Sequence, residues 1–594
     1  MLKKFVLNAL SSFVGAWLAI VLGIVATVVF IFAMMGKFAM SDGNAEKLTD
    51  NSVLQIDLSG VIEEVEKPSG LDINMLMRGD LDRPQTLNRI VDAIREGADN
   101  KKVKGIYLKC DGVSAAPATL HALRDALADF KKQNKFIYAY GGNYSQGDYY
   151  VASIADSIFM NPQGMLSLHG ISGSTPFYKG LFDKLGVQFQ VIKVGTFKSA
   201  VEPYIMDRMS EPARAQLDTL YTNIWSVMRG QMSQSRGFKN AEIDSLISQN
   251  VTFKKPEFLL KSKLVDRLVY ERQMGDIIAH KIGEDDADDV NYVTTRFLST
   301  QYALGAKTGG DQVAVLYATG EINETNDAGI NCDKLVPEIL ELADDDDVKA
   351  LVLRVNSPGG SVYGTEQIWE ALEYFKQQKK PLIVSMGDYA ASGGYWISSG
   401  ADYIFADELT ITGSIGIFGL IPEFQGLTQK IGVNIETVST HPGADFPDLF
   451  HPMSDSQRNA MQEWINAGYD QFISRVAIGR KMPENKVRAI AEGRVWDAVS
   501  AKRIGLVNDF GTLYDAVEYA AKKAGIEKKY SVGVYPVLEP GIWNFLPSAE
   551  VMTMVQSLSG QFPNADMKTL AIMAKILYRE PLQALMPEFT IDMR

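Results

Sequence analysis

The chain of 594 residues is too long for one compact core, and its 46% hydrophobic content indicates two or more folded units, not a mostly disordered protein. The formal net charge is −13 at pH 7, which argues against a nucleic-acid-binding protein, because such proteins need a basic face. Two cysteines, Cys110 and Cys332, cannot form a disulfide scaffold or a four-cysteine metal site, and the sequence does not decide whether they pair.

The first predicted element is a membrane anchor. Residues 11–35 carry no charge and are mostly apolar, and about 20 such residues suffice to cross a bilayer. The run exceeds the roughly 7–15 residues of a removable signal peptide core, so we expect an uncleaved span. Residues 1–10 would be a short cytoplasmic tail and 36–50 a linker. Two lysines precede the span and two follow it, so charge alone leaves the orientation open.

The rest of the chain contains a duplication. Four blocks recur in the same order about 245 residues apart: Val103–Lys109 with Val348–Arg354, Ala155–Phe159 with Ala401–Phe405, Gly180–Val187 with Gly426–Val433, and Leu264–Asp266 with Leu506–Asn508. This recurrence indicates two copies of one domain. We place the copies at residues 51–305 and 310–530, followed by a C-terminal extension, 531–594, whose role the sequence leaves open.

Each copy has a pattern of alternating strands and helices. In the second copy, the aliphatic run Ala350–Val355 ends in turn-forming residues, and Thr365–Gln377 then has apolar residues at helical spacing. Pro381–Met386 returns to a buried strand. Strand–helix–strand units imply parallel pairing, so the expected fold class is α/β.

The two copies differ where chemistry is expected. Ser414 lies in a glycine-rich loop of the second copy and falls opposite Leu168 of the first. Lys198 of the first copy falls opposite Ala444 of the second. Each copy therefore lacks the reactive residue that the other holds, which suggests a serine–lysine dyad assembled across the duplication.

Such a dyad has a clear chemical basis. A serine hydroxyl is a poor nucleophile unless a base removes its proton during attack. Lysine can be that base only if burial lowers its pKa towards neutrality. We therefore predict a dry site between the repeats, with Ser414 as nucleophile, Lys198 as general base and Phe197 helping to exclude water.

The glycines near Ser414 predict an oxyanion hole. They allow a tight strand-to-helix turn with the backbone N–H of Ile415 as one donor. A second donor is expected from the turn that holds Gly359 and Gly360, because the lack of side chains lets a substrate approach the backbone.

Simpler interpretations remain open. A lone Gly-Ser-x-Gly is usually an ordinary turn, and Lys198 by itself fits a surface lysine. Ser392 fits a helix N-cap or a packing contact. No spacing supports a histidine-based site, although His441 is near in sequence, and the five histidines contain no His-Glu-x-x-His pair. The alternative functions are an inactive membrane-bound scaffold or binding module of the same fold, and an acyl-thioester enzyme.

Together, the anchor and four motifs resemble the signal peptide peptidase A family in its long, two-repeat, membrane-anchored bacterial form. The motifs are Gly195-Thr-Phe-Lys-Ser-Ala-Val-Glu-Pro203, Asn356-Ser-Pro-Gly-Gly-Ser361, Ala390-Ala-Ser-Gly-Gly-Tyr395 and Thr412-Gly-Ser-Ile-Gly416. The resemblance covers nearly the whole chain. It implies tandem crotonase-like or Clp-protease-like domains built from ββα spiral repeats, and a serine endopeptidase with Ser414 and Lys198 in the roles given above.

The same resemblance implies a substrate, an assembly and a location. The expected substrates are cleaved signal peptides and other hydrophobic peptides, hydrolysed through an acyl-enzyme. The expected assembly is a homotetramer on a bacterial inner membrane, with a single span and a periplasmic catalytic domain. Neither a metal, an organic cofactor nor a nucleic-acid partner is expected. No motif marks the peptide-bond preference.

Overall fold

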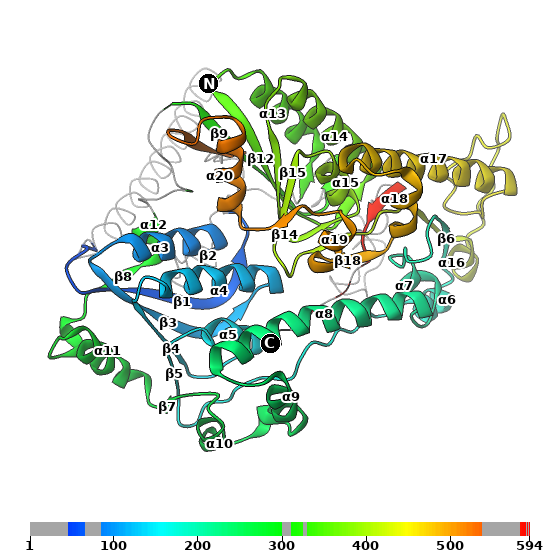
Figure 1. Cartoon of the computed structure of the whole chain (residues 1–594). Helices are drawn as coiled ribbons and strands as arrows, with labels where there is room; N and C mark the ends of the chain where they lie inside the picture. Colours follow the sequence, from blue (N-terminus) through cyan, green and yellow to red (C-terminus); the bar gives the residue numbers. More distant parts are fainter. Residues whose placement is uncertain are drawn as a thin grey trace, which may run out of the picture. The chain divides into compact units, whose positions relative to one another are not determined.

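The computed structural model describes residues 46–65, 85–299, 304, 310–324, 329–536, 582–587, 589, 591 and 593 (Figure 1). The predicted cytoplasmic tail, the anchor and most of the linker lie outside these residues. Among the helices of the described part, none is both long and apolar enough to cross a membrane. The described residues from Asp50 onward belong to one compact unit.

The first repeat is built on a parallel sheet, as the alternating pattern predicts. Its strands follow the order β2-β1-β3-β4-β5-β7, and β8 also pairs with β1. All of these pairings are parallel. The strands are β1 (Ser52–Glu63), β2 (Gln85–Thr86), β3 (Val103–Ser114), β4 (Phe136–Gly141), β5 (Ser157–Met160), β7 (Arg267–Leu268) and β8 (Tyr292–Thr294).

Helices connect these strands and cover the sheet. They are α3 (Leu87–Asp99), α4 (Pro117–Lys131), α5 (Gln146–Ala152), α6 (Lys179–Leu185), α7 (Glu202–Ile205), α8 (Glu211–Arg236), α9 (Asn240–Ser248), α10 (Pro256–Lys261), α11 (Met274–Ile282) and α12 (Thr295–Ser299). The long helix α8 extends from this repeat and contacts strand β18 of the second repeat (Figure 1).

The second repeat has the same strand order, which confirms two repeats of one α/β domain. Neighbouring strands β9-β12-β14-β15-β19 match β1-β3-β4-β5-β7 of the first repeat. The sheet also contains β16, β18 and β20. The strands are β9 (Gln312–Thr319), β12 (Val348–Ser357), β14 (Leu382–Ala391), β15 (Tyr403–Ala406), β16 (Ile411–Gly413), β18 (Val495–Asp497), β19 (Asp509–Phe510) and β20 (Ser531–Tyr535).

Helices α13 and α14 follow β-strands in the predicted alternation, and α15 and α17 pack together beside them (Figure 1). The buried side chains of Leu353, Phe375 and Trp396 belong to one large apolar core of this repeat. The helices are α13 (Cys332–Asp344), α14 (Val362–Gln377), α15 (Gly393–Ser399), α16 (Gln425–Lys430), α17 (Asp455–Arg480), α18 (Glu484–Ile490), α19 (Ala498–Ile504) and α20 (Leu513–Lys523).

A third sheet joins segments that are far apart in sequence. Its order is β11-β10-β13-β21-β17-β6. The strands are β6 (Gln188–Lys193), β10 (Ile322–Asn323), β11 (Ile330–Asn331), β13 (Gly359–Ser361), β17 (Phe418–Glu423) and β21 (Leu582–Leu585). Strand β6 of the first repeat pairs antiparallel with β17 of the second. This pairing brings the segment after β6, which holds Lys198, beside the segment before β17, which holds Ser414.

Two parts of the predicted C-terminal extension, 531–594, belong to these sheets. Strand β20 pairs in parallel with β9, so the sheet of the second repeat continues beyond residue 530. Strand β21 lies between β13 and β17 and is antiparallel to both. The described residues of the extension therefore contribute strands to the second repeat and to the sheet shared by both repeats.

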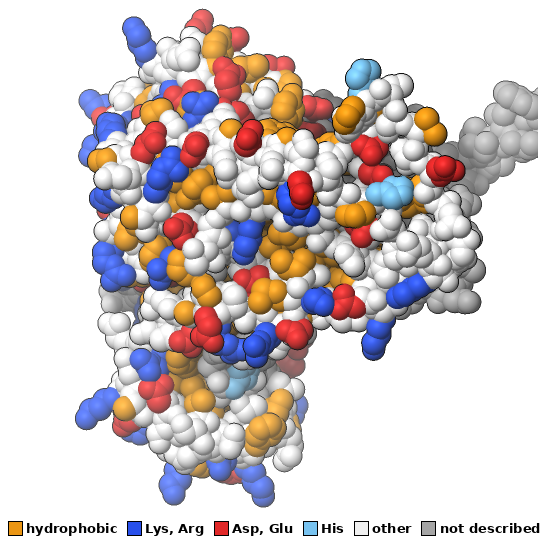
Figure 2. All heavy atoms as spheres, turned by 90° about the vertical axis from the view of Figure 1, so that its right-hand side faces the viewer, with side chains coloured by type: hydrophobic (Ala, Val, Ile, Leu, Met, Phe, Trp, Pro, Cys, Tyr) orange, Lys and Arg blue, Asp and Glu red, His pale blue; other side chains and the backbone are white. Residues whose placement is uncertain are grey.

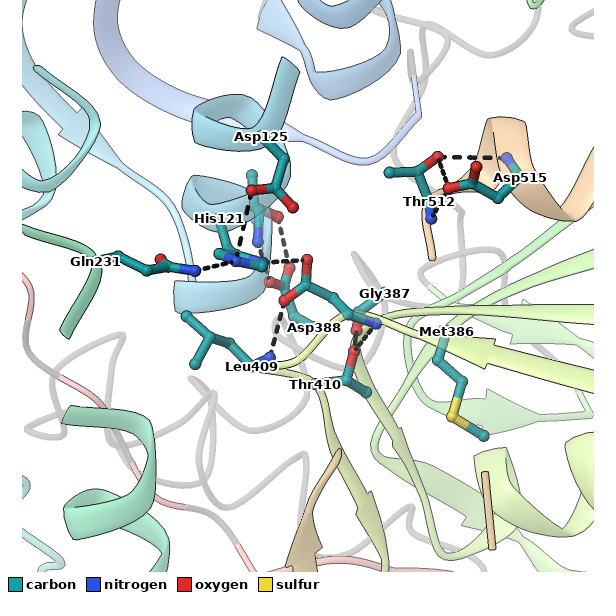
Figure 3. Close-up of polar contacts among 12 residues, drawn as sticks. His121, Asp125, Gln231, Met386, Gly387, Asp388, Leu409, Thr410, Thr512 and Asp515 are labelled. Carbon is teal, nitrogen blue, oxygen red and sulfur yellow. Dashed lines mark hydrogen bonds and ion pairs between the residues drawn. The ribbon is translucent and has the colours of Figure 1, made fainter. Parts of the chain in front are cut away.

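The two repeats also meet through polar side chains on helix α4. His121 Nδ1 lies 2.7 Å from Asp407 Oδ2 of the second repeat. The Oγ1 hydroxyl of Thr119 donates a hydrogen bond of 2.9 Å to Asp388 Oδ2. Figure 3 shows His121 and Asp388 at this junction. Polar groups buried in such a contact need partners, so these pairs restrict how the repeats can dock.

Candidate active site

Lys198 is held in place by the backbone of the segment before β18. The N–H of Phe197 donates to the carbonyl of Glu492 at 2.9 Å. The next residue, Gly493, has a φ of +76°, and a Cβ at this position would lie 2.7 Å from the Cβ of Lys198. Glycine therefore allows a left-handed backbone and a close approach to Lys198 at the same point.

Ser414 follows the end of β16 in a tight turn. Gly413 has a φ of +80° and Ser414 itself a φ of +52°, a region that non-glycine residues rarely adopt. The N–H of Ser414 donates to the carbonyl of Arg494 at 2.6 Å. The turn leads into strand β17, so the predicted strand-to-helix turn is wrong: the apolar residues after Ser414 pair with β6.

The structure brings the predicted nucleophile and the predicted base together. Lys198 Nζ lies 3.2 Å from Ser414 Oγ and 3.2 Å from the carbonyl oxygen of the same residue. Both residues have 0% relative exposure. The two groups come from different repeats, as the comparison of the copies predicts. The surface-lysine interpretation of Lys198 is therefore wrong.

A third polar residue, Ser392, completes this cluster. Lys198 Nζ donates to Ser392 Oγ at 2.9 Å, and Ser392 is also fully buried. Ser392 precedes helix α15 and has a φ of +53°, but its side chain makes no capping hydrogen bond to the helix. The N-cap interpretation from the sequence is therefore incomplete. The motif Ala390-Ala-Ser-Gly-Gly marked this residue, but only the fold shows its contact with a lysine 194 residues away.

Burial lowers the pKa of Lys198 well below the usual lysine value. Removal from water disfavours the ammonium form, and the partners within hydrogen-bond distance are uncharged serine groups. A neutral amine has a lone pair that can accept the proton of the Ser414 hydroxyl. The arrangement therefore suits proton transfer between these two side chains.

The aromatic neighbour of the lysine is not the one expected. The ring centroid of Phe418 lies 6.0 Å from Lys198 Nζ, and Phe418 is buried. Phe197 is only partly buried, with its ring 5.1 Å from the Arg494 guanidinium. The prediction that Phe197 dries the site is therefore not supported, and Phe418 occupies that position.

The predicted oxyanion residues lie in two places. Ile415 is buried directly after Ser414, and its carbonyl accepts from Gly493 N–H at 2.7 Å. Gly359 and Gly360 form part of β13, with φ values of +104° and +154°. Gly359 packs against Gly393, the residue after Ser392, because a Cβ on Gly393 would lie 3.2 Å from the Gly359 Cα. Their role as donors stays a prediction.

Strand β21 lies beside this turn. Gly359 pairs with Leu585 and Gly360 with Ala584, while Phe418 on the other side pairs with Gln583. The N–H of Met586 donates to the carbonyl of Pro358 at 2.9 Å. Leu585 is buried in an apolar cluster with Val201 and Phe418. Val201 is three residues after Lys198 in the sequence, and Phe418 is four residues after Ser414. An extended peptide segment thus lies next to the dyad.

Other candidate residues lie elsewhere. His441 is exposed, and its Nδ1 is 3.1 Å from the neighbouring Thr440 hydroxyl. Cys110 and Cys332 are both buried and unpaired, which answers the question that the sequence left open. Among the described residues, no group of three or more His, Cys, Asp and Glu side chains is arranged to hold a metal ion.

Comparison with known proteins gives the family. The sequence model of peptidase family S49 matches residues 129–281 and 374–527, one segment in each repeat. Protease 4 of Salmonella typhi is 38% identical over 507 residues, which cover 82% of this chain and 81% of the relative. The chain belongs to peptidase family S49.

Two further relatives agree with this assignment. Protease 4 of Haemophilus influenzae is 33% identical, over 83% of this chain and 82% of its own length. The chloroplastic serine protease SPPA of Arabidopsis thaliana is 28% identical, over 83% of this chain and 72% of its own. The model of the Clp protease family matches residues 311–405, which agrees with a Clp-protease-like fold.

Membership of family S49 makes this protein a serine protease. It disfavours the scaffold and the acyl-thioester enzyme that the sequence left open. Over most of its length the chain is similar to the Protease 4 proteins of two bacteria, Salmonella typhi and Haemophilus influenzae. The S49 matches also fall on both repeats, in agreement with a duplicated peptidase domain.

Proposed function

We propose that this S49 peptidase is a membrane-anchored endopeptidase in which Ser414 is the nucleophile and Lys198 the general base. The observation that carries this proposal is the distance of 3.2 Å between Lys198 Nζ and Ser414 Oγ, in a site with 0% exposure of both residues. A buried amine next to a serine hydroxyl is a suitable base when no charged group holds it protonated, and among the described residues burial alone shifts the pKa of Lys198.

The reaction proceeds by acyl transfer. Ser414 Oγ bonds to the scissile carbonyl carbon while Lys198 Nζ takes the hydroxyl proton. The tetrahedral intermediate then breaks its C–N bond, and Lys198 passes the proton to the leaving amine. Water attacks the resulting ester with Lys198 again as base, which releases the acid and restores the serine.

Two further features support this mechanism. Ser392 accepts a hydrogen bond from Lys198 Nζ and orients the amine, as the third residue does in other nucleophile–base pairs. The backbone N–H groups of Ile415, Gly359 and Gly360 are the proposed oxyanion donors. Gly359 packs near Ser392 at the start of α15, which supports a position close to the reacting carbonyl.

The substrate is an extended hydrophobic peptide. Strand β21 is antiparallel to both β13 and β17, so the space between these strands accepts a peptide backbone by strand pairing. The buried contact of Leu585 with Val201 and Phe418 supports a preference for apolar side chains. Cleaved signal peptides have this character. In this proposal a substrate pairs with β13 and β17 only after β21 has left.

The apolar run 11–35 supports a single membrane span, with the catalytic repeats on the periplasmic side of a bacterial inner membrane. Exposed apolar residues on the surface support self-association, and the number of four subunits is the one that the family resemblance implies. Exposed apolar residues lie in the segment between α16 and α17, and Figure 2 shows the side of the molecule on which these helices lie. They are Ile431, Val433, Val438, Phe446 and Phe450.

The decisive experiment combines hydrolysis with labelling. Ser414→Ala should abolish hydrolysis of a hydrophobic reporter peptide, and an acylating serine inhibitor should label the wild-type chain at Ser414. Hydrolysis that survives Ser414→Ala, or labelling at another serine, would refute the proposal. Protease accessibility in spheroplasts tests the location, and the mass of the detergent-solubilised protein tests the tetramer.

A further inference from the structure

Strand β14 is irregular near its end, close to the active site. Val355 of β12 pairs with Met386 of β14, and the next paired residues are Ser357 and Ala390. Between these two pairs β12 advances by two residues and β14 by four. Residues 387–389 therefore bulge opposite Asn356. Bulges redirect a strand and its side chains, and they are frequent beside active sites.

Asp388, in the middle of this bulge, contacts the other repeat. Its Oδ1 accepts from the N–H of Thr119 at 2.9 Å, and its Oδ2 accepts from the Thr119 hydroxyl at 2.9 Å. Thr119 is in the first turn of α4, whose N-cap residue, Ala116, has no side-chain oxygen. The carboxylate from the second repeat therefore supplies the missing cap, where a helix favours negative charge.

Asn356 links this carboxylate to the turn that contains Gly359. Its Nδ2 lies 3.4 Å from Asp388 Oδ2 and 3.3 Å from Glu64 Oε2, and its Oδ1 accepts from the N–H of Tyr389 at 3.1 Å. The same asparagine is three residues before Gly359. Movement of Asp388 would therefore shift the start of this turn.

The bulge also leads directly to the partner of the lysine. After Asp388, strand β14 continues to Ala391 and ends before Ser392, which accepts from Lys198 Nζ. The hydroxyl of Thr412 donates to the carbonyl of Ala390 at 2.6 Å and ties this end of β14 to the strand before Ser414. Asp388 thus precedes Ser392 in the same chain segment, and the end of its strand is hydrogen-bonded to the strand that leads to Ser414.

We propose that Asp388 is a positioning residue: by fixing the β14 bulge to α4 of the other repeat, its carboxylate aligns Ser392 with Lys198 and sets the Gly359 turn. This inference rests on the proposed Ser414–Lys198 mechanism. It assigns this one contact between the two repeats, Asp388 with Thr119, a direct effect on the rate of the chemical step.

The charge around Asp388 provides an independent readout. Burial, and next the carboxylate of Glu64, raise its pKa to about 6, while Thr119 and Arg354 act in the opposite direction. Tyr389 is the titratable neighbour on β14 itself. Protonation therefore removes the ionised cap as the pH falls through about 6. Lys198 gains its own proton as the pH falls, so two groups should shape the acid limb.

The test compares Asp388→Asn with a matched variant, Asp407→Asn. Both carboxylates come from the second repeat and contact helix α4, but Asp407 contacts His121 and not the Asn356 network. At pH 8, Asp388→Asn should lower kcat for a reporter peptide about 10- to 100-fold with an unchanged KM, because small misplacement of catalytic groups is costly. Asp407→Asn should keep kcat within about threefold.

Two measurements decide the interpretation. Below pH 6, log kcat of the wild type should fall more steeply with pH than that of Asp388→Asn, because the wild type loses the Asp388 charge as well as the neutral Lys198 amine. In hydrogen–deuterium exchange, residues 356–361 and 389–392 should exchange at least tenfold faster in Asp388→Asn but not in Asp407→Asn. Equal effects of the two variants on kcat and exchange would overturn the inference and leave a purely structural contact.

The exchange measurement also separates this inference from the proposed function. If Ser414→Ala abolishes hydrolysis and Asp388→Asn changes neither kcat nor exchange, the positioning role fails while the mechanism stands. If Ser414→Ala retains hydrolysis, the mechanism fails and the positioning role of Asp388 in catalysis fails with it. Faster exchange would then show only that Asp388 orders these segments.

Discussion

Lys198 Nζ lies 3.2 Å from Ser414 Oγ, although 216 residues separate them in the chain. Strand pairing explains this proximity. Lys198 follows β6 and Ser414 precedes β17, and these two strands are antiparallel neighbours. One residue from each repeat therefore reaches the same buried point, and the following predictions depend on that geometry.

Lys198→Arg should inactivate the enzyme. Arginine keeps the positive charge but does not release a proton at accessible pH, so it cannot act as a base. We expect kcat to fall about 10²- to 10⁴-fold, the range typical of a lost general base. Activity of Lys198→Arg close to that of the wild type, measured with a reporter peptide, would contradict the role of Lys198.

The rate should fall in acid because only neutral Lys198 accepts the serine proton. Its pKa is lowered by burial, so activity should be lost as the pH falls through that lowered value.

The unfolded chain binds this proton up to about pH 10.4, so the free energy of unfolding should rise with pH over the interval between the two pKa values of Lys198. Lys198→Met should remove this contribution, as measured by denaturant unfolding at several pH values.

Ser392→Ala should reduce kcat about tenfold or more while leaving KM unchanged, because Lys198 loses the acceptor that orients its amine. Ser398→Ala is the matched control. Ser398 is also buried and in α15, but its hydroxyl donates to the carbonyl of Gly394. If both variants have the same kcat, the hydrogen bond from Lys198 to Ser392 is not important for catalysis.

Gly493→Ala should impair catalysis through Lys198. The new Cβ would lie 2.7 Å from the Cβ of Lys198, so the lysine segment must shift. Gly525→Ala is the control, because Gly525 has a similar φ of +73° but no atom within 4 Å of the new Cβ. Both variants should lose about 1 kcal/mol of stability from backbone strain. Only Gly493→Ala should lower kcat, by tenfold or more if a shift approaching 1 Å results.

Ala584→Asp should lower KM with little change in kcat. Ala584 is fully buried in β21, and a carboxylate there should expel the strand from between β13 and β17. A site that is occupied by its own chain raises the apparent KM by the reciprocal of the fraction of open molecules. If nine in ten molecules are closed, we expect about a tenfold decrease in KM.

The control for this variant is Ala241→Asp, an exposed position in α9. It should leave KM and kcat unchanged. An unchanged KM in Ala584→Asp, with the melting temperature preserved, would show that β21 does not compete with the substrate.

The sequence alone was sufficient to predict the duplicated α/β architecture and the proximity of Ser414 and Lys198. Corresponding blocks at near-constant spacing predict corresponding strands, and the structure shows the same strand order in both repeats. Ser414 and Lys198 were identifiable because each aligns with an unreactive residue of the other copy, Leu168 and Ala444 respectively. Both predictions come from aligning the two copies residue by residue, which needs only the sequence.

Other parts of the site depend on contacts that the order of residues does not reveal. The apolar run after Ser414 fits a helix or a buried strand, and its pairing with β6 decides between them. The position of Ser392 before a helix suggests a cap, and its hydrogen bond with Lys198 becomes visible only in the folded structure. Strand β21 covers only four residues, too few for a periodic pattern, and is defined by partners on both sides.

Under the proposed mechanism, the division of Ser414 and Lys198 between the repeats has a consequence for protein synthesis. The lysine leaves the ribosome long before the serine, so a nascent chain that has completed only the first repeat carries no nucleophile for it to activate. Strand β6 must also wait for β17 before the two side chains can meet. Proteolytic competence therefore arises late in translation, after most of the chain has been made.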